Sequence, residues 1–147
     1  MNKKIIITLS FIALFFSSCE NTDDIPLLNE LTVTNRMVSG TWKITRFVYK
    51  NTTKTADYTG VSFDFDAISV MVNNTGTLPV AGGWGVTDEG FEGAPELVFT
   101  MALTSVEPRF TAISDDWEII ESTSTRLKLQ DENLETSTMD YLTFEKN

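Results

Sequence analysis

Apolar and polar residues alternate with a period of two through most of the chain after Gly40, and this pattern constrains the fold more than any other feature. Side chains alternate across a β-strand, so such runs predict strands with one buried and one solvated face. Gly, Asn, Asp and Pro separate the runs, as turn residues do. The pattern predicts eight strands, at Thr41 to Tyr49, Val61 to Asp66, Ile68 to Val72, Gly83 to Thr87, Glu96 to Met101, Trp117 to Ser122, Thr125 to Gln130 and Tyr141 to Glu145.

The predicted strands have an apolar face and a polar face. The apolar face collects Trp42, Ile44, Phe63, Phe65, Ile68, Val70, Trp84, Val86, Leu97, Phe99, Met101, Trp117, Ile119, Leu127, Leu129, Leu142 and Phe144. The polar face carries Lys43, Thr45, Asp64, Asp66, Ser69, Glu118, Arg126, Lys128, Thr143 and Glu145. This division is typical of an antiparallel sheet with one solvated face. Because closure removes unpaired edges, we expect an all-β fold, an up-and-down antiparallel eight-stranded β-barrel.

Two segments lie outside the predicted strands. A loosely periodic apolar set from Leu27 to Val38, followed by Gly40, predicts a short N-terminal helix closed by glycine. The connection from Ala102 to Asp116 is longer than most in a compact domain. We expect this connection to fold over one mouth of the barrel.

The first residues of the chain have the pattern of a secretory signal peptide. Lys3 and Lys4 precede an apolar stretch from Ile5 to Phe16, which is too short to span a bilayer as a helix. Ser17 and Ser18 then precede Cys19, the single cysteine of the chain, and this ending resembles a bacterial lipobox. The resemblance implies cleavage before Cys19 and its lipidation with palmitate-type chains. The alternative is an ordinary secreted protein with a chance cysteine near its cleavage site.

These features divide the chain into a signal peptide at 1–18, a flexible polar tether at 19–30 and one domain at 31–147. The acidic residues Glu20, Asp23 and Asp24 resemble the export signal of Bacteroidetes surface lipoproteins; as an alternative, they form a solvated linker. The predicted location is therefore the outer membrane, on the cell surface or on the periplasmic face, with the membrane as a partner through the lipid.

The amino-acid composition excludes several kinds of binding and catalytic chemistry. The net charge of −10 makes the chain a poor partner for nucleic acid. The absence of histidine excludes Ser-His and Cys-His nucleophiles, and the single cysteine allows no internal disulfide. A catalytic carboxylate pair would have to come from Asp64, Asp66, Asp115, Asp116 and Glu118, all at positions where solvated acids or turn residues are ordinary. We therefore predict no enzyme, no cofactor and no metal site.

Several motifs resemble a known family. Gly40-Thr41-Trp42 opens the first strand, as the Gly-x-Trp signature does in lipocalins. A second element at Gly82–Val86, a third at Asp115–Ile120, and the runs Arg126–Leu129 and Leu142–Lys146 follow in an order that is similar to the lipocalin-like lipoproteins of Bacteroidetes. The resemblance covers the chain from Cys19 to its end. It implies that Trp42 closes the narrow end of the barrel and that Arg126 or Lys146 packs across it. The chain is shorter than most lipocalins and lacks their disulfide.

Two functions are compatible with this resemblance. In the first, the barrel binds a small apolar or amphipathic ligand, with Trp84, Phe99, Phe110 and Trp117 lining its mouth and Trp42 and Arg126 at the closed end. The alternative role of each aromatic side chain is core packing, because eight strands enclose little more space than their own side chains fill. In the second, the protein is a non-catalytic interaction or accessory protein of a nutrient or glycan uptake system. Its partner at the cell surface would contact the long loops at 50–60 and 102–116.

Overall fold

The computed structural model describes residues 28–91 and 95–147. The elements in chain order are α1 (Glu30–Met37), β1 (Thr41–Tyr49), β2 (Thr52–Thr53), the 3-10 helix η1 (Thr55–Tyr58), β3 (Ser62–Phe65), β4 (Ser69–Asn73), β5 (Val80–Asp88), β6 (Leu97–Leu103), α2 (Pro108–Thr111), β7 (Asp116–Ser122), β8 (Arg126–Asn133) and β9 (Thr138–Lys146). The expected short helix and all eight expected strands are present.

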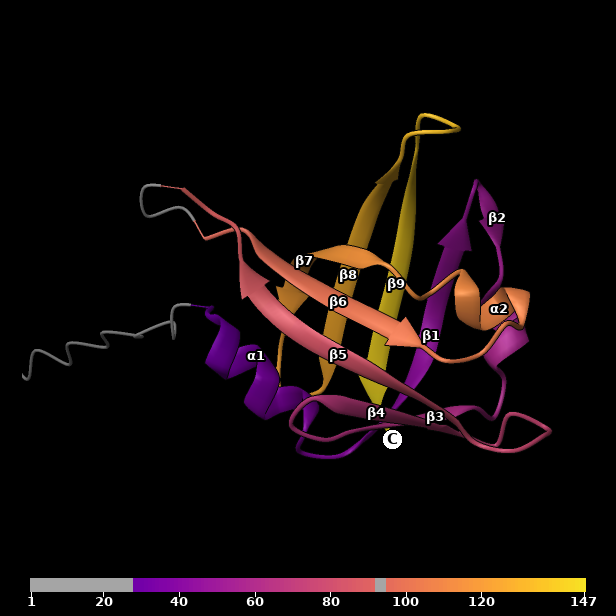
Figure 1. The fold of residues 1–147 in the computed structure, drawn as a ribbon. Helices are drawn as coiled ribbons and strands as arrows, with labels where there is room; N and C mark the ends of the chain where they lie inside the picture. Colours follow the sequence, from indigo (N-terminus) through magenta and orange to yellow (C-terminus); the bar gives the residue numbers. More distant parts are fainter. Residues whose placement is uncertain (1–27, 92–94) are drawn as a thin grey trace, which may run out of the picture.

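Within the described residues the strands form one antiparallel sheet that closes on itself (Figure 1). Consecutive strands from β3 to β9 pair with their neighbours, and the sheet closes because β1 pairs with both β3 and β9. The two-residue strand β2 pairs with Val48 and Tyr49, at the far end of β1. The predicted eight-stranded up-and-down barrel is confirmed.

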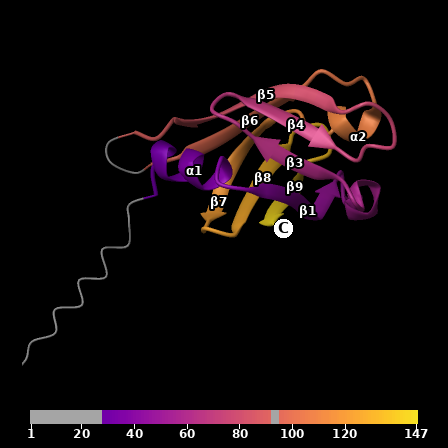
Figure 2. The ribbon, with the colours of Figure 1, turned by 90° about the horizontal axis from the view of Figure 1, so that it is seen from below.

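Helix α1 covers the end of the barrel where β1 begins (Figures 1 and 2). The Asn29 side chain caps the helix by accepting the Thr32 N–H at 2.8 Å, as N-terminal capping residues do. Val33 and Met37 lie one turn apart on the buried face of the helix. The Glu30 carboxylate accepts the Asp88 N–H at the end of β5, and the Arg36 guanidinium donates to Ser122 O at the end of β7. The helix therefore fits across the barrel end as a cap.

Two β-bulges change the alternation that the sequence predicts. The β1–β9 register shifts between Ile44 and Arg46, so that Phe47, and not Arg46, is the next inward residue. The β7–β8 register shifts between Ile119 and Glu121, so that Glu121 lies on the outer side next to the exposed Ile120. A bulge adds one residue to a strand and reverses the faces of all residues beyond it.

Two residues differ in exposure from the prediction. Ile68 was expected inside but is 78% exposed, because it belongs to the turn between β3 and β4 rather than to a strand. Thr143 lies on the outer face, as predicted, but is buried there. Its strand partners are Arg46 and Lys128, whose long side chains flank it on the outer face.

Candidate functional site

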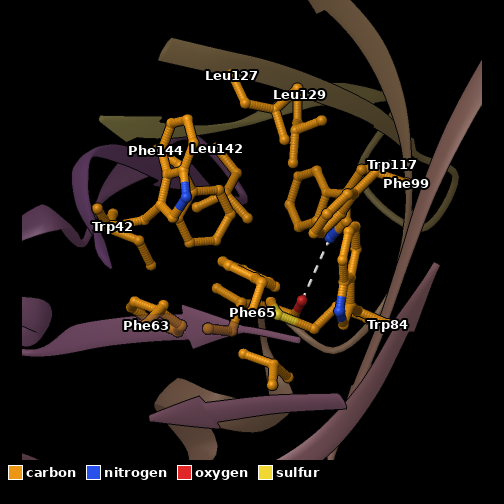
Figure 3. Packing of buried hydrophobic residues seen from close by; sticks show 14 of the residues in the cluster. Trp42, Phe63, Phe65, Trp84, Phe99, Trp117, Leu127, Leu129, Leu142 and Phe144 are labelled. Atoms are coloured by element: carbon orange, nitrogen blue, oxygen red, sulfur yellow. Dashed lines mark hydrogen bonds between the residues drawn. The ribbon is translucent and has the colours of Figure 1, made fainter. Parts of the chain in front are cut away.

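The five aromatic residues predicted to contact a ligand all lie in the hydrophobic core. Trp42, Phe99 and Phe110 are fully buried, and Trp84 and Trp117 nearly so. Figure 3 shows the side chains of Trp42, Trp84, Phe99 and Trp117 pointing into the interior of the barrel. Phe65 contacts the Trp84, Phe99 and Phe144 rings in edge-on geometry at centroid distances of 5.1–6.0 Å. Such distances are those of packed aromatic pairs, so the interior is filled by the chain's own rings.

Each indole N–H of the three tryptophans is used by the fold. Trp42 Nε1 donates to Met37 O at 2.8 Å, and Trp84 Nε1 donates to Asp66 O at 2.7 Å. Trp117 Nε1 donates to Ile113 O at 3.3 Å. A buried indole needs such a partner, and here each partner belongs to a segment outside the strands. The tryptophans therefore fasten α1, the β3–β4 turn and the β6–β7 connection to the barrel.

Of the two cations that the lipocalin resemblance offered for Trp42, Lys146 occupies that place. Its Nζ lies 5.3 Å from the centroid of the Trp42 ring and donates to Ser39 Oγ. Arg126 lies on the outer surface, where its Nε pairs with Glu121 Oε1 at 2.7 Å. Lys128 holds the other oxygen of the same carboxylate at 2.6 Å, and these two hydrogen bonds lower the pKa of Glu121. Arg126 thus belongs to a surface ion-pair network.

The other end of the barrel is closed by η1 and α2. Phe47, at the end of β1, packs edge-on against Tyr58 of η1 at 5.5 Å, and Tyr58 packs against Phe110 of α2 at 6.5 Å. The Tyr58 hydroxyl donates to Arg109 O, and burial raises the pKa of this phenol. Periodicity along strands could not find Tyr58, because η1 is a short helix within a loop.

Arg109 ties three loops together at this closed end. Its Nη1 donates to Asp57 O at 3.0 Å, its Nη2 donates to Thr75 O at 2.6 Å, and its Nε pairs with Glu107 at 3.0 Å. The planar guanidinium offers donors in several directions and suits such bridging. The connection from Ala102 to Asp116, which contains α2, therefore contributes Phe110 and Ile113 to the core.

A small cleft, here called the mouth cleft, lies between these two segments. Its walls are Phe47, Tyr49, Tyr58, Pro108 and Ala112, and its charged residues are Lys54, Asp57 and Arg109. Its volume is about 190 Å³. The walls are aromatic and aliphatic, but the space is below the size typical of a site for a drug-sized ligand.

A larger and more polar cleft, here called the seam cleft, opens where β1 and β3 separate. Its volume is about 430 Å³. It is lined by Thr41, Lys43, Ile44, Thr55, Ala56, Tyr58, Thr59, Gly60, Val61, Ser62, Asn74 and Asn147. Among these side chains Lys43 is the only charged one, in a chain with 21 acidic and 11 basic residues.

The seam exists because the β1–β3 ladder is short. Only Thr41 with Asp64 and Trp42 with Phe63 are paired. A continued ladder would join Ile44 to Val61, but the Val61 N–H donates to Tyr58 O at 3.0 Å instead. The η1 segment therefore diverts β3 away from β1 and opens the wall of the barrel.

The acidic residues considered for catalysis do not converge on either cleft. Asp64 accepts Thr41 Oγ1 at 2.6 Å and Asn73 Nδ2 at 2.8 Å, so it fastens the start of β1 to β3 and β4. Asp66 and Asp115 each accept the N–H of the following residue, in turns before a strand. Glu118 accepts from Gln130 across the β7–β8 pair. These contacts are structural, and the absence of enzyme activity stays a prediction.

The remaining predictions concern residues that the structure describes only in part. Cys19 and the signal peptide lie outside the described residues, as does most of the tether, whose last residues lead into α1. Over residues 28–91 and 95–147, no group of three or more acidic side chains could hold a metal ion. In the same residues no helix has the length and hydropathy needed to cross a bilayer.

No protein-family model, curated protein or solved structure matches this chain.

Proposed function

We propose that the protein is a lipid-anchored, non-catalytic binding module of the bacterial outer membrane that recognises its ligand or partner on the outside of the barrel. The anchor is supported by the basic start, the apolar stretch from Ile5 to Phe16 and the Ser17-Ser18-Cys19 ending. Two or more acyl chains hold a protein to a membrane far more firmly than one. The lipocalin-like pattern supports a binding role, as an analogy of fold.

The filled interior is the observation that carries this proposal. Neither the mouth cleft nor the seam cleft is lined by Trp84, Phe99 or Trp117. A ligand inside the barrel would have to displace rings that already contact one another and indoles that already donate to carbonyl oxygens. Recognition on the exterior needs no such rearrangement, and loops and clefts on a rigid scaffold are common binding sites.

Titration with a fluorescent fatty acid tests the location of binding. Tryptophan emission should show no saturable change, because all three indoles are packed among side chains of the core. A saturable change that disappears in Trp84→Phe would place a ligand inside the barrel and contradict the proposal.

Cross-linking on intact cells, followed by purification from solubilised membranes, tests the partner. A stoichiometric protein that cross-links through residues 50–60 or 102–116 would support the accessory role in nutrient or glycan uptake. Recovery of a lone monomer with bound lipid would instead favour a small-molecule ligand.

Metabolic labelling with a palmitate analogue tests the anchor. The label should enter the wild-type precursor and be lost in Cys19→Ala, since Cys19 is the single thiol of the chain. Labelling that persists in Cys19→Ala, or that never occurs, would contradict lipidation at this residue.

The mouth cleft supports a second candidate function, the binding of a small amphipathic ligand. Phe47, Tyr49 and Pro108 offer an apolar wall, and Lys54 stands at its edge. A short acyl or aryl group could lie against the wall with a carboxylate at Lys54. Loss of fatty-acid binding in Lys54→Met with unchanged stability would support this candidate.

A further inference from the structure

The seam cleft brings together polar groups that the fold leaves without internal partners. The Lys43 ammonium, the Ser62 hydroxyl and the Asn74 amide all line it. Among the described residues, none of these three side chains makes a hydrogen bond or an ion pair within the protein. By contrast, nearby Thr41, Thr55 and Thr59 have their hydroxyls engaged by Asp64, Phe47 and Ala56. The free groups therefore gather on one side of the molecule.

Main-chain geometry adds to these groups. The Asn147 N–H donates to Thr41 O at 3.0 Å, so the main-chain groups of Thr41 face β9. Hydrogen-bonding directions alternate along an antiparallel strand, so those of Trp42 and Ile44 face β3. Trp42 pairs with Phe63 there. Val61, which would stand opposite Ile44, donates its N–H to Tyr58 O instead. The Ile44 main chain is thus directed toward the seam cleft.

The floor of the cleft is apolar, and a single cationic side chain stands at its wall. Ile44, Tyr58 and Val61 are buried beneath it. Lys43 is the one charged side chain of the lining, and Glu145, its cross-strand partner on β9, is not paired with it. An apolar floor, hydroxyl and amide groups at the wall and one cation suit a small ring that has C–H faces, several hydroxyls and a carboxylate.

We propose that the seam cleft between β1 and β3 binds a small hydroxylated carboxylate of the sugar-acid type, whose carboxylate pairs with Lys43 and whose hydroxyls contact Ser62, Asn74 and the Ile44 main chain. The volume of about 430 Å³ lies in the range of small-molecule sites. A charge-assisted hydrogen bond to Lys43 supplies the orientation. This inference rests on the proposed function, since it assigns a ligand class to binding outside the barrel.

Calorimetric titration of the full-length protein in detergent with D-glucuronate tests the inference. D-glucose, which lacks the carboxylate, and acetate, which lacks the ring, serve as matched probes. Glucuronate should bind saturably and at least about tenfold more tightly than either probe, because a charged hydrogen bond and the ring contacts are both needed.

Variants of two exposed lysines separate the clefts. Lys43→Met should weaken glucuronate binding by about tenfold or more and remove its advantage over glucose. Lys54→Met, which removes a cation from the mouth cleft, should leave glucuronate binding unchanged. Ser62→Ala should weaken glucose and glucuronate alike, and equal thermal midpoints would show that all three variants fold.

Three outcomes would overturn the inference. These are the absence of saturable glucuronate binding, binding that Lys43→Met and Ser62→Ala leave unchanged, and binding that Lys54→Met abolishes instead. If glucuronate fails while cross-linking finds a stoichiometric partner, the inference fails and the proposed function stands. If glucuronate fails and the purified protein carries neither a partner nor a bound lipid, both are contradicted.

Discussion

At the end of the barrel where β1 begins, helix α1 lies across the opening and the buried Trp42 indole holds it. At the opposite end, the short segments η1 and α2 share the closure, and they are held by Tyr58, Phe110 and Arg109. The indole contact of the first closure joins residues that are near in sequence, Met37 and Trp42, although Glu30 and Arg36 also reach the ends of β5 and β7. The second joins η1, the β4–β5 turn and α2, which are distant in sequence.

This difference has a physical meaning. A contact between near neighbours closes a short loop and costs little chain entropy, whereas a contact between distant segments depends on the sheet that holds both of them. The α1 cap should therefore respond to local substitutions. The η1–α2 closure should respond to loss of packing anywhere in its aromatic cluster.

The largest effect is expected at the η1–α2 end. Phe110→Ala should lower the free energy of unfolding by about 3–5 kcal/mol, because it removes a fully buried ring. Urea denaturation measures the loss. Val106→Ala is the matched control in the same connection, since Val106 is 95% exposed and should change stability little. Equal effects of the two substitutions would show that α2 does not contribute to the core.

The α1 end is probed by Trp42→Phe, with a smaller expected loss of about 1–3 kcal/mol. The phenyl ring keeps most of the packing, but the buried Met37 carbonyl oxygen loses the indole N–H that donates to it at 2.8 Å. The same urea experiment measures it. Lys146→Met is the control, since it removes the cation above the ring and its hydrogen bond to Ser39 but leaves the indole hydrogen bond in place. A loss in Trp42→Phe no larger than in Lys146→Met would contradict the role of the indole hydrogen bond.

Tyr58→Phe separates packing from hydrogen bonding at the η1–α2 end. The ring contacts with Phe47 and Phe110 stay, and the bond to Arg109 O is lost, so the expected cost is about 1 kcal/mol near neutral pH. Burial raises the pKa of Tyr58 above its ordinary value of 10.0. The protonated Tyr58 hydroxyl therefore makes its full contribution to the free energy of unfolding below pH 10, and this contribution is lost as pH rises beyond that value.

The alkaline range supplies the check on Tyr58. Wild-type stability should fall above pH 10 more steeply than that of Tyr58→Phe. Tyr141→Phe, on the outer face, is the control and should keep the wild-type profile. Parallel profiles for wild type and Tyr58→Phe would contradict the buried phenol.

The smallest effect is expected at the β8–β9 hairpin. Asp131 faces Asp140 directly across the strands, and burial, together with nearby Asp115 and Asp140, raises the pKa of Asp131. A carboxyl group whose pKa is raised by folding costs no stability below its unfolded pKa, near 3.8. It lowers the free energy of unfolding once the pH is high enough to ionise it. Asp131→Asn should therefore stabilise the protein at neutral pH by about 0.5 kcal/mol or less, and the gain should vanish on acidification.

Thermal midpoints of Asp131→Asn between pH 3 and pH 7 measure this difference. Glu132→Gln, at the exposed neighbouring position, is the control for a general change in charge. A gain of the same size in both variants would assign the effect to net charge rather than to the Asp131–Asp140 pair.

Much of the barrel could be predicted from the sequence because strand alternation is a local signal. Trp42, Phe63 and Leu127 lie inside as their positions in the alternation predict. The prediction failed where a local signal is insufficient. The bulge beside Thr45 depends on pairing with β9, and the side of Ile68 depends on where a turn begins.

The candidate site was less accessible to sequence reasoning. The seam cleft exists because η1 diverts β3 away from β1, which is a relation between segments and leaves no periodic pattern. Strand alternation places Lys43 on the solvated face and gives no signal for Tyr58, which lies in the polar loop at 50–60. The aromatic residues were correctly placed inside, but aromatic composition alone cannot distinguish a lined cavity from a filled one.

Closure of the sheet through β1 and β9 also governs when folding can finish. The first and last strands must meet, so a nascent chain still lacking its C-terminal residues has no complete barrel to form. Such long-range topology slows folding compared with helical domains. If the protein is exported, as proposed above, this delay would keep the chain unfolded until synthesis is over, which is the state that passage through a translocation channel requires.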